Sequence, residues 1–193
     1  MNITILIGIL AGFLHILAFA IYNKQMLRGT SYPNSATWTL WTFLTVLNVS
    51  SYFVMGGDLV KSILPIASSV ACVLTFLFAI YKGKLSKVDP WDGLALGIGI
   101  VAGLVWWYYK SATYANLILQ ISIAVSFVPT YRGVWKDPRK EKALPWYIWS
   151  SAYVLSVIVI ILRWQNQYQD LAYPINCLVL HAVVGLMTNR NKG

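Results

Sequence analysis

Long apolar runs follow one another along the chain and are separated by short polar stretches. A bilayer-crossing helix needs about 20 mostly apolar residues, and seven runs meet this requirement. Several runs contain Ser, Thr, Asn and Gly, which favour contact between helices or a cavity over contact with lipid. The predicted spans are residues 3–22, 36–55, 60–81, 92–109, 113–131, 145–163 and 168–188.

The composition agrees with an all-α membrane protein. Of the 193 residues, 58% are hydrophobic and 11% are charged, whereas a soluble domain carries roughly 25% charged residues. The first run lacks the basic start and the cleavage site of a signal peptide, so we expect it to be retained. The two cysteines, Cys72 and Cys177, lie in apolar runs and predict neither a disulfide nor a metal site.

Basic residues gather in the loops on one side of the predicted spans. The loops after the first, third and fifth spans and the tail hold twelve Lys and Arg, and the other side holds Lys61, Lys110 and Arg163. The positive-inside rule then predicts an outside N-terminus and a cytoplasmic C-terminus, and we expect a bacterial or archaeal cytoplasmic membrane. Such scattered charges do not suit a nucleic-acid site. The twelve are Lys24, Arg28, Lys82, Lys84, Lys87, Arg132, Lys136, Arg139, Lys140, Lys142, Arg190 and Lys192.

The middle of every predicted span is free of Asp, Glu, Lys and Arg. Because intramembrane charges mark ion or proton coupling, this pattern favours uncoupled transport of a neutral solute. It also argues against an enzyme, since no acid–base pair, phosphate loop or metal motif is present, and we expect no cofactor. His15 and His181 lie within spans; a helix–helix hydrogen bond is the simpler expectation and titration the alternative.

The chain repeats itself. Residues 37–48 resemble residues 145–156, so spans one to three match spans five to seven and span four has no partner. A single inserted span restores the direction of the repeat, which predicts two parallel three-helix repeats joined by a linker helix. The predicted units are residues 1–81, 82–112 and 113–193. The matched positions include Trp38 with Trp146, Trp41 with Trp149, Leu47 with Leu155, Phe19 with Phe127, Ser68 with Cys177 and Pro65 with Pro174.

This arrangement resembles the superfamily of SWEET, PQ-loop and PnuC transporters. The likeness depends on the three-one-three order of short spans, the outside N-terminus, and Pro65 and Pro174 at like depth of the third and seventh spans. The segment Trp146-Tyr147-Ile148-Trp149 matches the Trp-x-x-Trp pair of the sixth PnuC span, and Trp38 and Trp41 form a second such pair.

The resemblance implies facilitated diffusion of a sugar, a nucleoside or a vitamin precursor by alternating access. The chain looks like an outlying member, because Pro129 stands in the fifth span without the Gln that completes a Pro-Gln pair. The expected partners are a small-molecule solute and membrane lipid. The sequence does not decide whether the protein forms a homo-oligomer. A non-transporting receptor or assembly partner on the same fold, as in KDEL receptors, is the alternative; the basic loop 132–142 would then be its docking surface.

Two tryptophan pairs are the candidate stacking surfaces. Residues three apart share one face of a helix, so Trp38 and Trp41 form one aromatic surface and Trp146 and Trp149 form its mate. Facing each other across a cavity, indole rings would suit a sugar ring or a flat aromatic base. An aromatic belt at the membrane interface is the alternative.

Four polar residues are the candidate hydrogen-bonding groups. Asn48 and Ser156 fall on equivalent positions near mid-membrane, and Asn176 lies in the seventh span, with Ser68 beside its counterpart Ala67. In SWEET-like carriers an Asn in the third and seventh spans binds sugar hydroxyls, which the resemblance implies for Asn176. Hydrogen bonding between helices is the alternative for these side chains.

Proline and glycine mark where the spans bend and pack. Pro65 and Pro174 would each remove a backbone hydrogen bond inside a helix, so both are predicted hinges, with static kinks as the alternative. The Gly-x-Gly-x-x-x-Gly stretch at 97–103 indicates close helix packing.

Overall fold

The computed structural model describes residues 2–31, 35–81 and 90–190, without the side chains of 35–37, 39, 79 and 80. Lys82, Lys84, Lys87 and Lys192, which entered the predicted orientation, lie outside the described residues. Every regular element of the described chain is helical. The elements are α1 (Ile3–Leu27), α2 (Ser35–Gly56), α3 (Leu59–Tyr81), α4 (Pro90–Tyr109), α5 (Ala112–Ser126), α6 (Val128–Lys136), η1 (Pro138–Lys140), α7 (Ala143–Leu162), η2 (Tyr168–Leu171) and α8 (Ala172–Met187).

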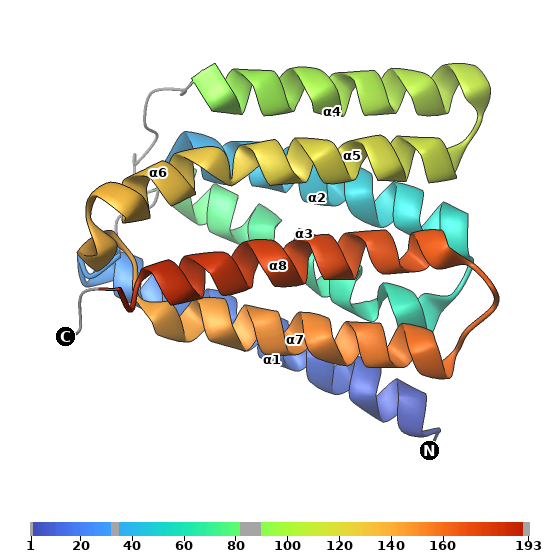
Figure 1. Ribbon diagram of the computed structural model, residues 1–193, viewed down its shortest axis with the longest axis horizontal. Coiled ribbons are helices and arrows are strands. Elements are labelled where there is room, and N and C mark those ends of the chain that lie inside the picture. Colours follow the sequence, from blue (N-terminus) through green and yellow to red (C-terminus); the bar gives the residue numbers. More distant parts are fainter. Residues whose placement is uncertain (1, 32–34, 82–89, 191–193) are drawn as a thin grey trace.

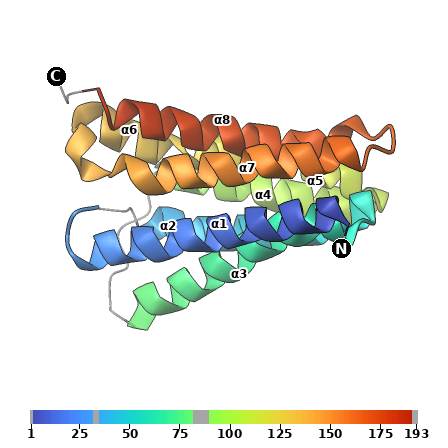
Figure 2. The same ribbon diagram turned by 90° about the horizontal axis from the view of Figure 1, so that it is seen from below.

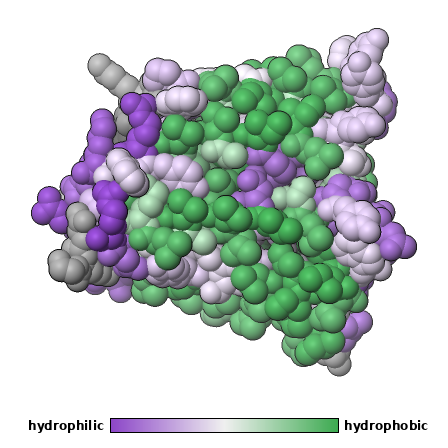
Figure 3. Space-filling model, viewed as in Figure 1, coloured by the Kyte–Doolittle hydropathy of each residue, from purple (hydrophilic) through white to green (hydrophobic). Residues whose placement is uncertain are grey.

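Six stretches of the described chain are long and apolar enough to cross a membrane. The stretch Ala112–Lys136 includes both α5 and α6, and the remaining predicted span is a shorter apolar helix over Leu40–Gly56. Large apolar side chains such as Phe13, Leu74 and Leu186 are exposed around the outside. The face drawn in Figure 3 carries an apolar band with hydrophilic residues at both ends, which indicates an integral membrane protein.

Six helices form a closed ring. Going around it, each helix packs on the next in the order α1, α3, α2, α5, α8 and α7, and α7 returns to α1. Helix α4 lies outside the ring against α5 and α2, and Gly99 lets it approach: a Cβ there would stand 2.8 Å from Leu44 Cδ2.

The helices alternate in direction between two ends of the molecule. Helices α1, α3, α5 and α8 run one way and α2, α4 and α7 the other, with the two termini at opposite ends (Figures 1 and 2). We call these the N-terminal end, which carries the α2–α3, α4–α5 and α7–α8 connections, and the C-terminal end, which carries α6 and η1.

The fifth predicted span is broken, contrary to the continuous helix expected over 113–131. Helix α5 ends at Ser126, Phe127 caps it, and α6 begins at Val128. Pro129 explains the break, since proline has no N–H to donate and its ring clashes with the preceding turn. The break places the Phe127 ring in the centre of the molecule, where it is 3% exposed.

The two predicted hinge prolines lie in different settings. Pro65 is inside α3, as expected. Pro174 is the third residue of α8, which begins only at Ala172 after the short helix η2. Because the first four N–H groups of a helix have no intrahelical acceptor, Pro174 removes no helical hydrogen bond, and the expected mid-helix break does not occur there.

Candidate functional site

The four candidate tryptophans are buried inside the ring rather than placed at its lipid-facing surface. Trp146 and Trp149 on α7 are 0% and 1% exposed, and Trp38 and Trp41 on α2 are 4% and 9% exposed. Ring centroids lie 4.9 Å apart in the α2 pair and 5.2 Å apart in the α7 pair. An interfacial belt would leave such rings exposed, so this arrangement favours an internal aromatic site.

Two phenylalanines join the tryptophan pairs in matching ways. Phe19 on α1 contacts one tryptophan of each pair, and Phe127 contacts the other two. The contacts of Phe19 correspond to those of Phe127 when every residue is replaced by its match in the sequence repeat. The centroid distances are 5.6 Å for Phe19–Trp38, 6.3 Å for Phe127–Trp146, 5.0 Å for Phe19–Trp149 and 4.8 Å for Phe127–Trp41.

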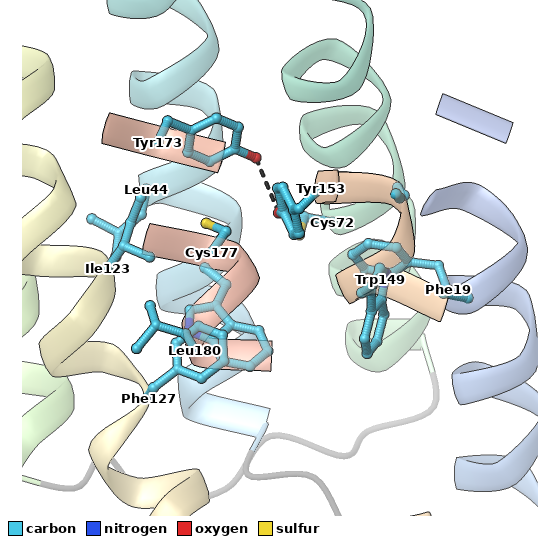
Figure 4. Close-up of a cluster of buried hydrophobic side chains, with 14 of the residues drawn as sticks. Phe19, Leu44, Cys72, Ile123, Phe127, Trp149, Tyr153, Tyr173, Cys177 and Leu180 are labelled. Atoms are coloured by element: carbon cyan, nitrogen blue, oxygen red, sulfur yellow. Dashed lines mark hydrogen bonds between the residues drawn. The ribbon is translucent and has the colours of Figure 1, made fainter. Parts of the chain in front are cut away.

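A small cavity of about 40 Å³ lies beside this cluster. Figure 4 shows several of the side chains that line it, among them Phe19, Cys72 and Trp149. A cavity of this size holds one or a few water molecules, whereas sites for small molecules occupy roughly 300–1,000 Å³. In this structure the cavity therefore has no room for a molecule larger than water. The lining residues come from α1, α2, α3, α5, α7 and α8 and from the α5–α6 junction: His15, Phe19, Trp38, Trp41, Leu44, Thr45, Ser68, Cys72, Ile123, Phe127, Trp149, Tyr153, Tyr173, Cys177 and His181.

The predicted amide ligands lie outside this cavity. Asn116 Nδ2 donates to Asn48 Oδ1 at 3.1 Å and to Ser51 Oγ at 2.9 Å, which joins α5 to α2. Asn176 Nδ2 donates to the Gln120 main-chain oxygen at 2.9 Å, which joins α8 to α5. In this form both asparagines make hydrogen bonds between helices, the alternative that the sequence left open.

The two candidate serines are separated as well. Ser68 on α3 is buried and lines the cavity. Ser156 on α7 is buried but is not a lining residue. Of the predicted polar ligands, the structure thus brings only Ser68 to the tryptophans.

Both histidines line the cavity, and neither makes the helix–helix hydrogen bond expected from the sequence. His181 Nδ1 lies 2.7 Å from the Cys177 main-chain oxygen of its own helix. His15 is 1% exposed, and its ring nitrogens have no hydrogen-bond partner among the described residues. The two histidines could not be distinguished from the sequence, because only the packed structure shows which imidazole lacks a partner.

Two ion pairs close the N-terminal end between its connecting segments. Lys61 Nζ lies 2.8 Å from Asp170 Oδ2, and both side chains are 1% exposed. Arg163 Nε lies 2.7 Å from Asp58 Oδ2. Each pair joins residues 58–61 to residues 163–170, so these contacts hold the α2–α3 connection to the α7–α8 connection.

The environment of Asp58 keeps it ionised. Partial burial would raise its pKa, but hydrogen bonds from Arg163 and from the main-chain N–H groups of Lys61 and Val60 outweigh burial and lower the pKa below the usual value. In the sequence, Lys61 and Arg163 bear only on the predicted membrane orientation. The signal for the ion pairs is the presence of Asp58 and Asp170 on the same, otherwise charge-poor side.

A different contact closes the C-terminal end. The Tyr22 hydroxyl on α1 donates to Glu141 Oε1 at 2.8 Å, just before α7. Glu141 is 6% exposed, and this burial raises its pKa to about 7, although the hydrogen bond from Tyr22 acts in the opposite direction. Its Oε2 is buried without a hydrogen-bond partner in the described structure.

Comparisons with protein-family models, with curated proteins and with solved structures give no match for this chain. Within the described residues, no three His, Cys, Asp or Glu side chains gather in a way that would hold a metal ion. The features of the structure that bear on function are the cavity, its aromatic walls and the contacts at the two ends of the molecule.

Proposed function

We propose that the protein is a membrane facilitator that moves a small neutral solute through the central cavity by alternating access. The cavity lining carries this proposal. Trp41 and Trp149, Phe19 and Phe127, and Ser68 and Cys177 line one space, and each pair occupies positions matched by the sequence repeat. A site built from equivalent positions of two halves is typical of carriers with internal repeats.

We propose further that the halves are α1–α3 and α5–α8, with α4 as the linker. The ring order supports this division, because advancing three places around the ring takes α1 to α5, α3 to α8 and α2 to α7. The members of each such pair also run in the same direction (Figure 1). Because of this three-one-three order, we propose that the protein is an outlying member of the SWEET, PQ-loop and PnuC superfamily, with its N-terminus outside.

The contacts at both ends suit such a mechanism. The Lys61–Asp170 and Asp58–Arg163 pairs join the halves at one end, and the Tyr22–Glu141 hydrogen bond joins them at the other. Rocking of the halves would open one set while the other stays formed. In this account Trp41, Trp149 and Ser68 contact the solute, while Asn48 and Asn176 keep α2, α5 and α8 together.

Uptake into proteoliposomes without an ion gradient tests the proposal. The labelled panel would contain D-glucose, D-xylose, uridine, cytidine and pyridoxine. We expect saturable uptake of at least one compound and about a tenfold loss in Trp149→Ala, because a stacking ring contributes about 1–3 kcal/mol per base. Trp107→Ala is the matched control, since Trp107 on α4 is 70% exposed. Absence of flux for the whole panel, or equal loss in both variants, would contradict the proposal.

A further inference from the structure

We propose that His15 and His181 are the hydrogen-bonding groups of the solute site, in the role that was predicted for Asn48 and Asn176. This inference rests on the proposed function and assigns the polar chemistry of its cavity. The ligand it implies is an uncharged ring compound that carries a donor and an acceptor on one edge.

The unpartnered imidazole of His15 is the first observation. A buried polar group without a hydrogen bond costs about 1–3 kcal/mol, so each such group in a native protein needs an explanation. His15 lines the cavity, both of its ring nitrogens are buried without a partner among the described residues, and its side chain is surrounded by rings. A solute entering the cavity would supply the missing partner.

The two histidines flank the same pair of rings on α7. His15 lies 6.3 Å from Trp149 and 5.4 Å from Tyr153, measured between ring centroids. His181 lies 5.5 Å from Trp149 and 5.2 Å from Tyr153. A ring stacked in this space would therefore have an imidazole within reach from α1 and another from α8, one from each proposed half.

Hydrogen bonding fixes the chemistry of one imidazole. His181 Nδ1 faces the Cys177 carbonyl oxygen, which can only accept, so in the neutral ring Nδ1 carries the proton and Nε2 is an acceptor. His15 has no such constraint and offers one donor and one acceptor. Together the two imidazoles match a solute edge that has both a donor and an acceptor. A pair of sugar hydroxyls supplies such an edge, and so do the ring N–H and carbonyl groups of a nucleobase.

The neighbours of the histidines explain why this site prefers a neutral solute. The elements packed around His15 and His181 present Phe19, Cys72, Trp149, Tyr153, Tyr173 and Cys177. No Asp, Glu, Lys or Arg lines the cavity among the described residues. A charged solute would lose its hydration without gaining an opposite charge, whereas a neutral ring exchanges water for imidazole and aromatic contacts.

The repeat relates the histidines to apolar or thiol positions rather than to each other. His15 matches Ile123, and His181 matches Cys72, and all four residues line the cavity. The aromatic walls are therefore shared by the two halves, but the polar groups are not. A solute would consequently bind in one orientation.

Binding and uptake in His15 variants test the inference. The full-length protein would be titrated with the same five compounds, with binding followed by tryptophan fluorescence and flux measured in proteoliposomes. We expect His15→Phe, which keeps the ring volume, to weaken binding about tenfold. His15→Gln, which keeps a donor and an acceptor, should stay within about threefold of the wild type, and Phe13→Leu, on the lipid-facing side of α1, should change nothing.

The outcomes separate this inference from the proposed function. Wild-type binding and flux that persist in His15→Phe would overturn the histidine site and leave the facilitator in place. Equal loss in His15→Phe and His15→Gln, with thermal stability of the protein retained, would show that the imidazole packs rather than hydrogen-bonds. A wild-type protein that neither binds nor transports any compound would overturn the facilitator as well. Response to sugars alone, or to the nucleosides alone, would identify which edge the histidines recognise.

Discussion

At the scale of single residues, two buried polar groups differ in their partners. Lys61 and Asp170 are buried and paired, whereas neither ring nitrogen of His15 has a partner in the described structure. Leaving one member of the buried pair without its counter-charge would be costly. The imidazole of His15 keeps free hydrogen-bonding capacity, on which the proposed solute site depends.

The buried pair gives a prediction on stability. Asp170→Asn leaves the Lys61 ammonium inside the protein without its counter-charge, which costs on the order of 3–5 kcal/mol. We expect a clear fall in the thermal unfolding temperature of the protein in detergent. The double variant Lys61→Met with Asp170→Asn should recover part of this loss, since no buried charge remains. Equal destabilisation by both would show that the unpaired charge is not the cause.

Glu141 gives a prediction on pH dependence. Its pKa rises from 4.5 to about 7 on folding, so between these values the folded protein binds a proton that the unfolded chain has lost. The contribution of Glu141 to the free energy of unfolding is fully present below pH 4.5 and is lost as the pH rises to about 7. The loss is on the order of 3 kcal/mol. The stability of the wild type relative to Glu141→Gln should therefore fall across this window, as measured by thermal unfolding of both proteins.

Asp58 provides the contrast for that experiment. Its pKa is lowered on folding, so its contribution is present at neutral pH and is lost only as the pH falls below its ordinary value of 3.8. The two windows do not overlap. A slope between pH 4.5 and 7 that persists in Glu141→Gln would therefore rule out Glu141 as its source.

At the scale of elements, close packing between helices depends on a few small residues. A Cβ at Gly185 on α8 would stand 2.9 Å and 3.1 Å from the Tyr147 ring atoms Cε1 and Cδ1 on α7. Asn189 donates to the Tyr147 hydroxyl at 2.7 Å, which limits how far this ring can shift.

We therefore predict that Gly185→Ala destabilises the protein by about 1–2 kcal/mol, because overpacking exceeds the gain in helix propensity. Gly97→Ala on α4 is the matched control, since a Cβ there would meet nothing within 4 Å. Thermal unfolding of the two variants in the same detergent measures the difference. A rise in stability in both would contradict the tight α7–α8 contact.

The length of the apolar runs predicted most of the helices. The effect of each proline on its helix could not be predicted, because it depends on where the helix begins and ends. The runs over 3–22 and 145–163 correspond to α1 and α7, because burial in a membrane requires continuous apolar length. The break at Phe127 and the late start of α8 were missed. Pro65 and Pro174 occupy matched positions of the repeat, and only the position of the preceding helical turn decides whether each proline removes a hydrogen bond.

At the scale of the whole molecule, the tryptophan positions could be predicted and the hydrogen-bonding partners could not. Repetition and spacing indicated Trp41 and Trp149 as facing surfaces, and the structure brings both to one cavity. Asn48 and Asn176 were indicated by depth and resemblance, yet neighbouring helices use their amides. Depth in the membrane does not reveal which way a side chain points around the helix.

The ion pairs give a prediction on opening. Arg163→Gln removes the contact with Asp58 at the N-terminal end and leaves the Tyr22–Glu141 contact at the C-terminal end unchanged. If the proposed alternating access is correct, we expect the cavity to open more often toward the N-terminal side. Labelling of the cavity cysteines should then become faster from that side and not from the other. Equal acceleration from both sides would indicate general loosening rather than release of one end.

Labelling of Cys72 and Cys177 in the wild-type protein tests the central claim most directly. They are the only cysteines in the chain, and both line the cavity. A membrane-impermeant maleimide would be added to one side at a time of oriented proteoliposomes, with Cys72→Ala/Cys177→Ala as background. Alternating access predicts slow labelling from each side, slowed further by a transported solute. Labelling from neither side, or from one side alone, would contradict a cavity that opens in turn to both faces of the membrane.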